Sequence, residues 1–187
     1  MKTINHQLNQ TDFYIPNWDI EHLFVGTFNP EGGEKVNYYY GRPRNQTWNL
    51  ISEIFSDKFD PTSKDFFVLL KKHKIGCMDM IDKVIASEER IEKIIGKGYS
   101  DPQIINNYVK RVYNTDQILN IINKNRKTKV YSTWGKGSAI KHIEDWKNEV
   151  EKLEKINPLA SPSMAAWVPK GTKKFEYMLS DWKSKIY

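Results

Sequence analysis

The sequence predicts an α/β fold: a three-layer α/β/α sandwich with a central four-stranded parallel sheet, in one domain spanning residues 1–187. Short apolar runs typical of buried strands alternate with segments whose apolar residues recur at helical intervals. This alternation implies parallel strands joined by right-handed crossovers, with helices on both faces of the sheet. A length of 187 residues suits one domain. We see no internal repeat and no low-complexity segment.

The first half of the chain contains two expected strands. "EHLFVGTF" (21–28) is a short apolar run around a glycine, and "IGCMDMI" (75–81) is short enough to be a second strand. Between them, "QTWNLISEIF" (46–55) and "KDFFVLLKKH" (64–73) place apolar residues at helical intervals. Residues 82–100 mix helical propensity with two glycines, so we expect an elaborated connection there.

A long helix is expected over 101–124, because Asp101 suits an N-cap and Pro102 suits the first helical turn. "TKVYSTW" (128–134) is rich in residues that favour β-strands and is closed by Gly135.

The last part of the chain supplies an amphipathic helix at 138–155, a short strand that becomes a loop within 156–167, and a closing helix at 173–187. In open parallel sheets the ligand binds beyond the carboxyl ends of the strands, where the strand order reverses. The expected binding loops are therefore 27–45, 79–101, 134–138 and 159–167.

The composition, with 39% hydrophobic and 28% charged residues, is that of an ordinary globular protein. No apolar run approaches the ~18 residues that a membrane span needs, and "MKTINHQLNQTDFYIP" lacks the apolar core of a secretory signal. We expect a cytoplasmic protein. Cys77 is the only cysteine, which excludes an internal disulfide and sites built from several thiolates. The four histidines lack metal-ligand spacing, so no metal and no cofactor are expected.

Charge and aromatic content indicate the partner. A net charge of +6 attracts polyanions, although solvated lysines on helix faces explain such a charge equally well. The 13% aromatic content, with six tryptophans, is the better indication, because surplus rings can stack on nucleic-acid bases.

Three segments carry a family resemblance: "GTFNP" (26–30), "YYYGRPRNQTW" (38–48) and "LASPSMAAW" (159–167). They resemble motifs of the uracil-DNA glycosylase superfamily, closest to its mismatch-specific and hypoxanthine-directed branches. "IGCMDMIDKVIASEE" and "GYSDPQII" look like the strand and the helix start between those motifs. The resemblance runs in the right order from residue 22 to about residue 170. It implies a monofunctional DNA base-excision repair glycosylase that hydrolyses the N-glycosidic bond of uracil or hypoxanthine in DNA.

The resemblance also implies the catalytic residues. Asn29 and Asn45 are the candidates, since a carboxamide can hold the attacking water and read a base edge. For Asn29 the alternative is a turn with Pro30, and for Asn45 it is a helix N-cap. The first motif contains no aspartate, so we expect no strong water-activating carboxylate and a slow enzyme.

The base-binding and DNA-binding residues follow in the same way. The target base must be rotated out of the duplex and clamped against an aromatic face. The base-binding candidates are Gly26, Thr27, Phe28, Tyr40 and Gly41, with Tyr39 as a rival face and Tyr38 or Tyr39 expected to pack onto the sheet. The DNA-binding candidates are Arg42 and Arg44 for phosphates, Ser161, Pro162 and Ser163 for the backbone, and Met164 as a minor-groove wedge. Solvated arginines and a core-packed Met164 are the competing interpretations.

Two further features are assigned structural roles. Asp79 and Asp82 are interpreted as a strand end followed by a cap, and Cys77 as a core residue. We expect a monomer with DNA as its partner. The alternatives are a non-catalytic nucleic-acid-binding module of the same fold, or an enzyme that acts on small nucleosides or nucleotides.

Overall fold

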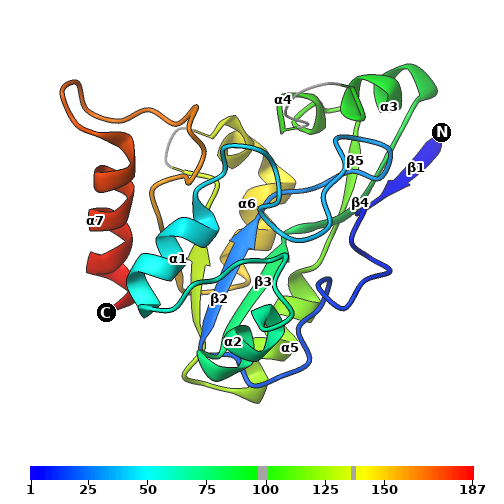
Figure 1. Cartoon of the computed structure of the whole chain (residues 1–187). Coiled ribbons are helices and arrows are strands. Elements are labelled where there is room, and N and C mark those ends of the chain that lie inside the picture. The colour runs from blue at the N-terminus through cyan, green and yellow to red at the C-terminus, as the bar shows by residue number, and fades with distance from the viewer. Residues whose placement is uncertain (97–100, 136–137) are drawn as a thin grey trace.

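The described residues form two β-sheets with helices around them (Figure 1). The structure, a computed structural model, describes residues 1–96, 101–135 and 138–187. A four-stranded parallel sheet has the order β3-β2-β6-β7, and a three-stranded antiparallel sheet has the order β1-β4-β5. The parallel strands are β2 (His22–Gly26), β3 (Ile75–Asp79), β6 (Lys129–Ser132) and β7 (Ile156–Pro158).

The expected α/β/α architecture with a central four-stranded parallel sheet is confirmed. In register, Gly26 pairs with Asp79 of β3, and Val25 pairs with Ser132 of β6, so the carboxyl ends of these strands meet at one edge. β3, the next strand of this sheet along the chain, lies on one side of β2, and β6, which comes later, lies on the other side. The strand order therefore reverses at β2, which is where this class of sheet binds its ligand.

Alternating residues of β2 pack against opposite helical layers, as the two-residue period of a strand requires. Phe24 packs with α1 (Thr47–Phe55), α2 (Phe66–Lys72) and α7 (Lys174–Ile186). Leu23 and Val25 pack with residues of α5 and α6.

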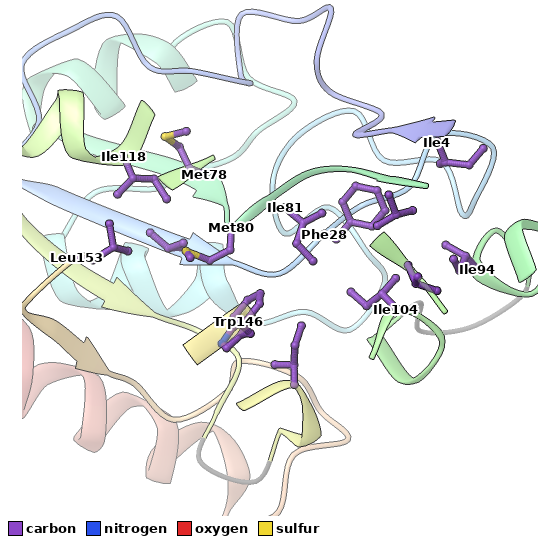
Figure 2. Packing of buried hydrophobic residues seen from close by; sticks show 14 of the residues in the cluster. Ile4, Phe28, Met78, Met80, Ile81, Ile94, Ile104, Ile118, Trp146 and Leu153 are labelled. Carbon is purple, nitrogen blue, oxygen red and sulfur yellow. The ribbon is translucent and has the colours of Figure 1, made fainter. Parts of the chain in front are cut away.

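The bounds of those two helices are Thr115–Lys124 for α5 and Glu144–Glu151 for α6. Their buried residues include Ile118 of α5 and Trp146 of α6, which Figure 2 shows beside Met78 and Met80.

The antiparallel sheet was not predicted. It consists of β1 (Lys2–Asn5), β4 (Ile81–Ala86) and β5 (Lys110–Tyr113). The expectation of one helix over 101–124 is wrong, because that segment contains α4 (Asp101–Ile104), β5 and α5. Pairing of β5 with β4, whose Val84 is fully buried, overrides the helical spacing of the sequence.

Two other expectations need correction. The connection expected over 82–100 contains most of β4 and α3 (Glu88–Ile94), whereas positions 97–100, with part of the expected helix start, lie outside the described residues. The helix expected at 138–155 is shorter: a 3₁₀ turn (Ala139–His142) is separated from α6 by Ile143, which is extended.

One buried hydrophobic cluster joins the two sheets. Figure 2 shows it running from Met78 and Ile118 beside the parallel sheet, through Phe28 and Ile81, to Ile4 of β1. The antiparallel sheet therefore shares its core with the parallel sheet. Over the described parts of the chain, every helix is too short or too polar to cross a membrane.

Candidate active site

A small pocket of about 120 Å³ lies at the carboxyl ends of β2, β3 and β6. Segments far apart in the sequence build its wall. The lining residues are Gly26, Thr27, Phe28, Asn29, Tyr40, Arg42, Asn45, Asp79, Asp101, Thr133, Trp134, Ser161, Pro162 and Ser163. Ten of the thirteen candidate site residues from the sequence are among them. Gly41, Arg44 and Met164 are not.

Two loops close the pocket, and they are in direct contact. We call residues 38–46 the tyrosine loop and residues 159–167 the serine-proline loop. The backbone N–H of Gln46 donates to the carbonyl oxygen of Pro162 at 2.9 Å, and Asn45 and Ser163 form an isolated antiparallel bridge. The rim of the pocket is therefore fixed by main-chain hydrogen bonding between segments more than 100 residues apart.

The three remaining candidates lie outside this pocket. A Cβ on Gly41 would lie 2.9 Å from the carbonyl oxygen of Tyr38, so this glycine permits a close approach within its own loop. Arg44 adopts a left-handed conformation with φ 68°. The side chain of Met164 is 39% exposed, so the competing interpretation of a core-packed methionine does not describe its position.

The neighbouring tyrosines have different environments. Tyr39 is buried, and its hydroxyl donates to the carbonyl oxygen of Tyr14 at 2.9 Å. Tyr40 lines the pocket from a left-handed backbone conformation with φ 59°, and its hydroxyl oxygen is 3.3 Å from Thr133 Oγ1. Burial raises the pKa of Tyr40 well above its ordinary value, so the ring remains a neutral phenol at the pocket wall.

The two candidate asparagines are already engaged in hydrogen bonds. Asn45 Oδ1 accepts the backbone N–H of Thr47, the first residue of α1, at 2.9 Å, but the N-cap of α1 is Gln46, so Asn45 supports the helix start from the position before the cap. Asn29 Nδ2 donates to Asp79 Oδ2 at 2.9 Å, which fixes the orientation of its carboxamide inside the pocket. Asn45 thus has a structural function, whereas Asn29 belongs to a polar network at the pocket.

Asp79 ends a strand, as expected, but it was not among the candidate site residues. It ends β3, it is 2% exposed, and it lines the pocket. Its Oδ1 lies so close to Gly26 that a Cβ there would be 2.2 Å away. The first motif contains no aspartate, but β3 brings a carboxylate to the same place. The expectation that no strong water-activating carboxylate is present stays untested, but a carboxylate does line the pocket.

His6 is a second residue that the sequence analysis missed. Its ring is fully buried, and its Nε2 is 2.9 Å from Asp79 Oδ2. The backbone N–H of Leu8 donates to His6 Nδ1 at 3.1 Å. Because Nδ1 accepts, we assign the proton to Nε2, which then donates to the carboxylate.

A second carboxyl group lines the pocket at the start of α4. Thr27 Oγ1 donates to Asp101 Oδ1 at 3.0 Å. Burial raises the pKa of Asp101 above its ordinary value, although the hydrogen bond from Thr27 and the charge of Arg42 act in the opposite direction. In the described ranges, no group of three or more His, Cys, Asp or Glu residues could hold a metal ion.

The comparison with known proteins shows the fold. No family model and no curated protein matches the chain. The chain resembles the solution NMR structure of a protein from Methanosarcina acetivorans for which a uracil DNA glycosylase function has been proposed. The TM-score is 0.53 and the identity 14%, over 92% of this chain and 97% of that one. The protein therefore has a uracil-DNA-glycosylase-like fold.

Proposed function

We propose that the protein is a monofunctional DNA glycosylase, which hydrolyses the N-glycosidic bond of a deaminated base such as uracil or hypoxanthine. The observation that carries this proposal is the meeting of the tyrosine loop and the serine-proline loop over one small polar pocket at the strand-order reversal. In this proposal the protein acts on DNA as a monomer in the cytoplasm, without a metal or a cofactor. The likeness to the M. acetivorans structure supports it at the level of fold.

The lining residues suit the chemistry of this reaction. An extruded base can stack against Tyr40 or Phe28. As the C1′–N bond breaks, its electron pair leaves with the base and positive charge develops on the sugar. Asp79, beside Asn29, lies where negative charge can stabilise that cation. The described lining residues include no lysine, so no amine is placed to form a Schiff base, and we expect an intact abasic site.

The rim of the pocket suits a DNA backbone. Arg42 of the tyrosine loop and Ser161 and Ser163 of the serine-proline loop line the pocket. Arginine and serine side chains contact phosphates in many protein–DNA complexes. The net charge of +6 adds a long-range attraction for the polyanion. Arg44 is in the tyrosine loop, and we assign it to a flanking phosphate. Met164 is in the serine-proline loop, and we assign it to the minor groove.

The test is an incision assay. The protein is incubated with labelled duplexes that contain uracil, hypoxanthine, xanthine or a thymine mismatch, and with an undamaged duplex as the control. Alkali then cleaves any abasic site. Incision of a damaged duplex supports the proposal. Binding without incision would instead indicate a non-catalytic module, and release of a base from free nucleosides alone would indicate a small-molecule enzyme.

A further inference from the structure

We infer that Asp79 takes the proton of the attacking water through Oδ1, and that His6 is the positioning residue that holds this carboxylate in place. This inference rests on the proposed function and deepens it. It replaces the view that an asparagine alone prepares the water.

The hydrogen bonds of Asp79 are unevenly distributed between its two oxygens. His6 Nε2 and Asn29 Nδ2 both lie 2.9 Å from Oδ2. Oδ1 is the oxygen turned toward Gly26, which itself lines the pocket. A carboxylate anchored through one oxygen presents the other at a fixed position, which is the geometry that a general base requires.

Hydrogen bonds also hold the main chain at Asp79. Asn114 Nδ2 donates to the carbonyl oxygen of Asp79 at 3.0 Å. The next residue, Met80, donates its N–H to the carbonyl oxygen of Gly26 at 3.0 Å. Positioning of this kind lowers the barrier, because little reorganisation is needed when the water reacts.

His6 can only donate to the carboxylate. Its Nδ1 is used as the acceptor for Leu8, and its ring is enclosed by Tyr14, Phe28 and Tyr39 at centroid distances of 5.3, 5.8 and 5.5 Å. The imidazole is fully buried, and both of its ring nitrogens face protein partners. Its function is therefore orientation of Asp79 rather than proton transfer.

In the proposed step, water replaces the base at C1′. The C1′–N bond breaks and its electron pair leaves with the base. A lone pair of the water forms the new C1′–O bond, and the water proton passes to Asp79 Oδ1. The departing base takes a proton from solvent, and Asp79 later returns its proton to solvent. No oxidant, reductant or co-reactant besides water is needed.

The titratable groups around Asp79 come from four segments. They are His6 and Tyr14 near the amino terminus, Tyr39 and Tyr40 of the tyrosine loop, Cys77 on β3, and Asp101 at the start of α4. The tyrosines and the cysteine are neutral near pH 7, because burial raises the pKa of each. Asp101 is the only other carboxyl group of this set.

The experiment measures single-turnover base release as a function of pH. We expect Asp79→Asn to lower the rate by about 10²-fold or more and to remove the acid limb of the profile. His6→Gln keeps an N–H donor near the position of Nε2, so it should stay within about tenfold of wild type. His6→Leu should lose more than about tenfold and move the acid limb to higher pH, because losing a donor disfavours the ionised carboxylate. A merely structural role of His6 would not move that limb.

Asp82→Asn is the matched control. It makes the same chemical change three residues further along, where the carboxylate accepts a hydrogen bond from the Tyr14 hydroxyl and does not line the pocket. Its rate should equal that of wild type. If Asp79→Asn is as fast as this control, the assignment of Asp79 is overturned.

The other outcomes are equally decisive. A wild-type profile without an acid limb overturns the assignment even if Asp79→Asn fails to fold. An unshifted limb in His6→Leu removes His6 from the inference and leaves Asp79. A wild-type protein that releases no base from any damaged duplex refutes the proposed glycosylase function itself, which distinguishes that failure from the others.

Discussion

Gly26 and Asp79 face each other across β2 and β3, and a Cβ on Gly26 would lie 2.2 Å from Asp79 Oδ1. The family resemblance suggested a base-binding role for this glycine. Its position shows a second function, because only a residue without a side chain leaves space for the carboxylate. Gly26 and Asp79 therefore depend on each other, although 53 positions separate them.

Gly26→Ala should displace the Asp79 side chain. We expect a loss of about 1–3 kcal/mol in the free energy of unfolding, the usual cost of overpacking. Base release should fall together with stability. Urea unfolding of Gly26→Ala, Asp79→Ala and the double variant tests the cause: the glycine substitution should cost less when Asp79 is already alanine. Equal costs in both backgrounds would locate the clash elsewhere.

The two candidate asparagines should respond differently to alanine substitution. Asn45→Ala removes the group that accepts the N–H of Thr47, so it should cost about 1 kcal/mol of stability, the usual contribution of one hydrogen bond. Asn29→Ala should lower the single-turnover rate by about 10²-fold or more, because Asp79 loses one of its donors and the water loses a partner. If neither variant lowers a confirmed activity by that much, the catalytic assignment of both asparagines is wrong.

Asp101 should make stability depend on pH. Burial raises its pKa above the ordinary value of 3.8. From about pH 4 to the folded-state pKa, the folded protein then binds more protons than the unfolded chain, so the contribution of Asp101 to stability falls as pH rises. Asp101→Asn should flatten this dependence in urea unfolding measured at a series of pH values. A slope identical to that of wild type would contradict the prediction.

Arg42→Ala should raise the pKa of Asp101 further. The arginine charge lowers the pKa of Asp101, so its removal should move the carboxyl titration to higher pH. Carboxyl carbon NMR of Asp101 measures the shift. An unchanged midpoint would show that solvent screens this pair.

Arg44 provides a test of DNA binding that is separate from catalysis. If its guanidinium contacts one phosphate, Arg44→Ala should reduce the slope of log affinity against log salt by about 0.9. Lys124→Ala is the control, since Lys124 ends α5 near the amino end of β6 and so lies at the opposite edge of the sheet. Equal slopes for both variants would remove Arg44 from the interface.

The parallel sheet could be predicted because its strands are short apolar runs bounded by turn residues. The antiparallel sheet beside it could not be predicted. Residues 101–124 have helical spacing throughout, and the strand Lys110–Tyr113 exists because Ile81–Ala86 offers it a partner. Such pairing is a property of the assembled fold, which local periodicity does not contain.

The site shows the same division between local and long-range information. Residues within the motif segments could be placed at the pocket, since carboxyl ends of parallel strands share one edge. That same rule could have identified Asp79, because its segment, 75–81, is also an expected strand of the parallel sheet. His6 had no such signal, because its place depends on β1 pairing with β4 and on its own bridge to Pro30.

The contact between His6 and Asp79 joins positions 73 residues apart, and this separation sets an order of events during synthesis. At translation speeds of about 5–20 residues per second, the aspartate is made roughly 4–15 s after the histidine. Until then, the imidazole of His6 cannot form its hydrogen bond with Asp79. In ribosome-bound chains that end before β3, the amino-terminal segment that contains His6 therefore lacks its partner. The pocket can form only after β3 has been made and His6 has paired with Asp79.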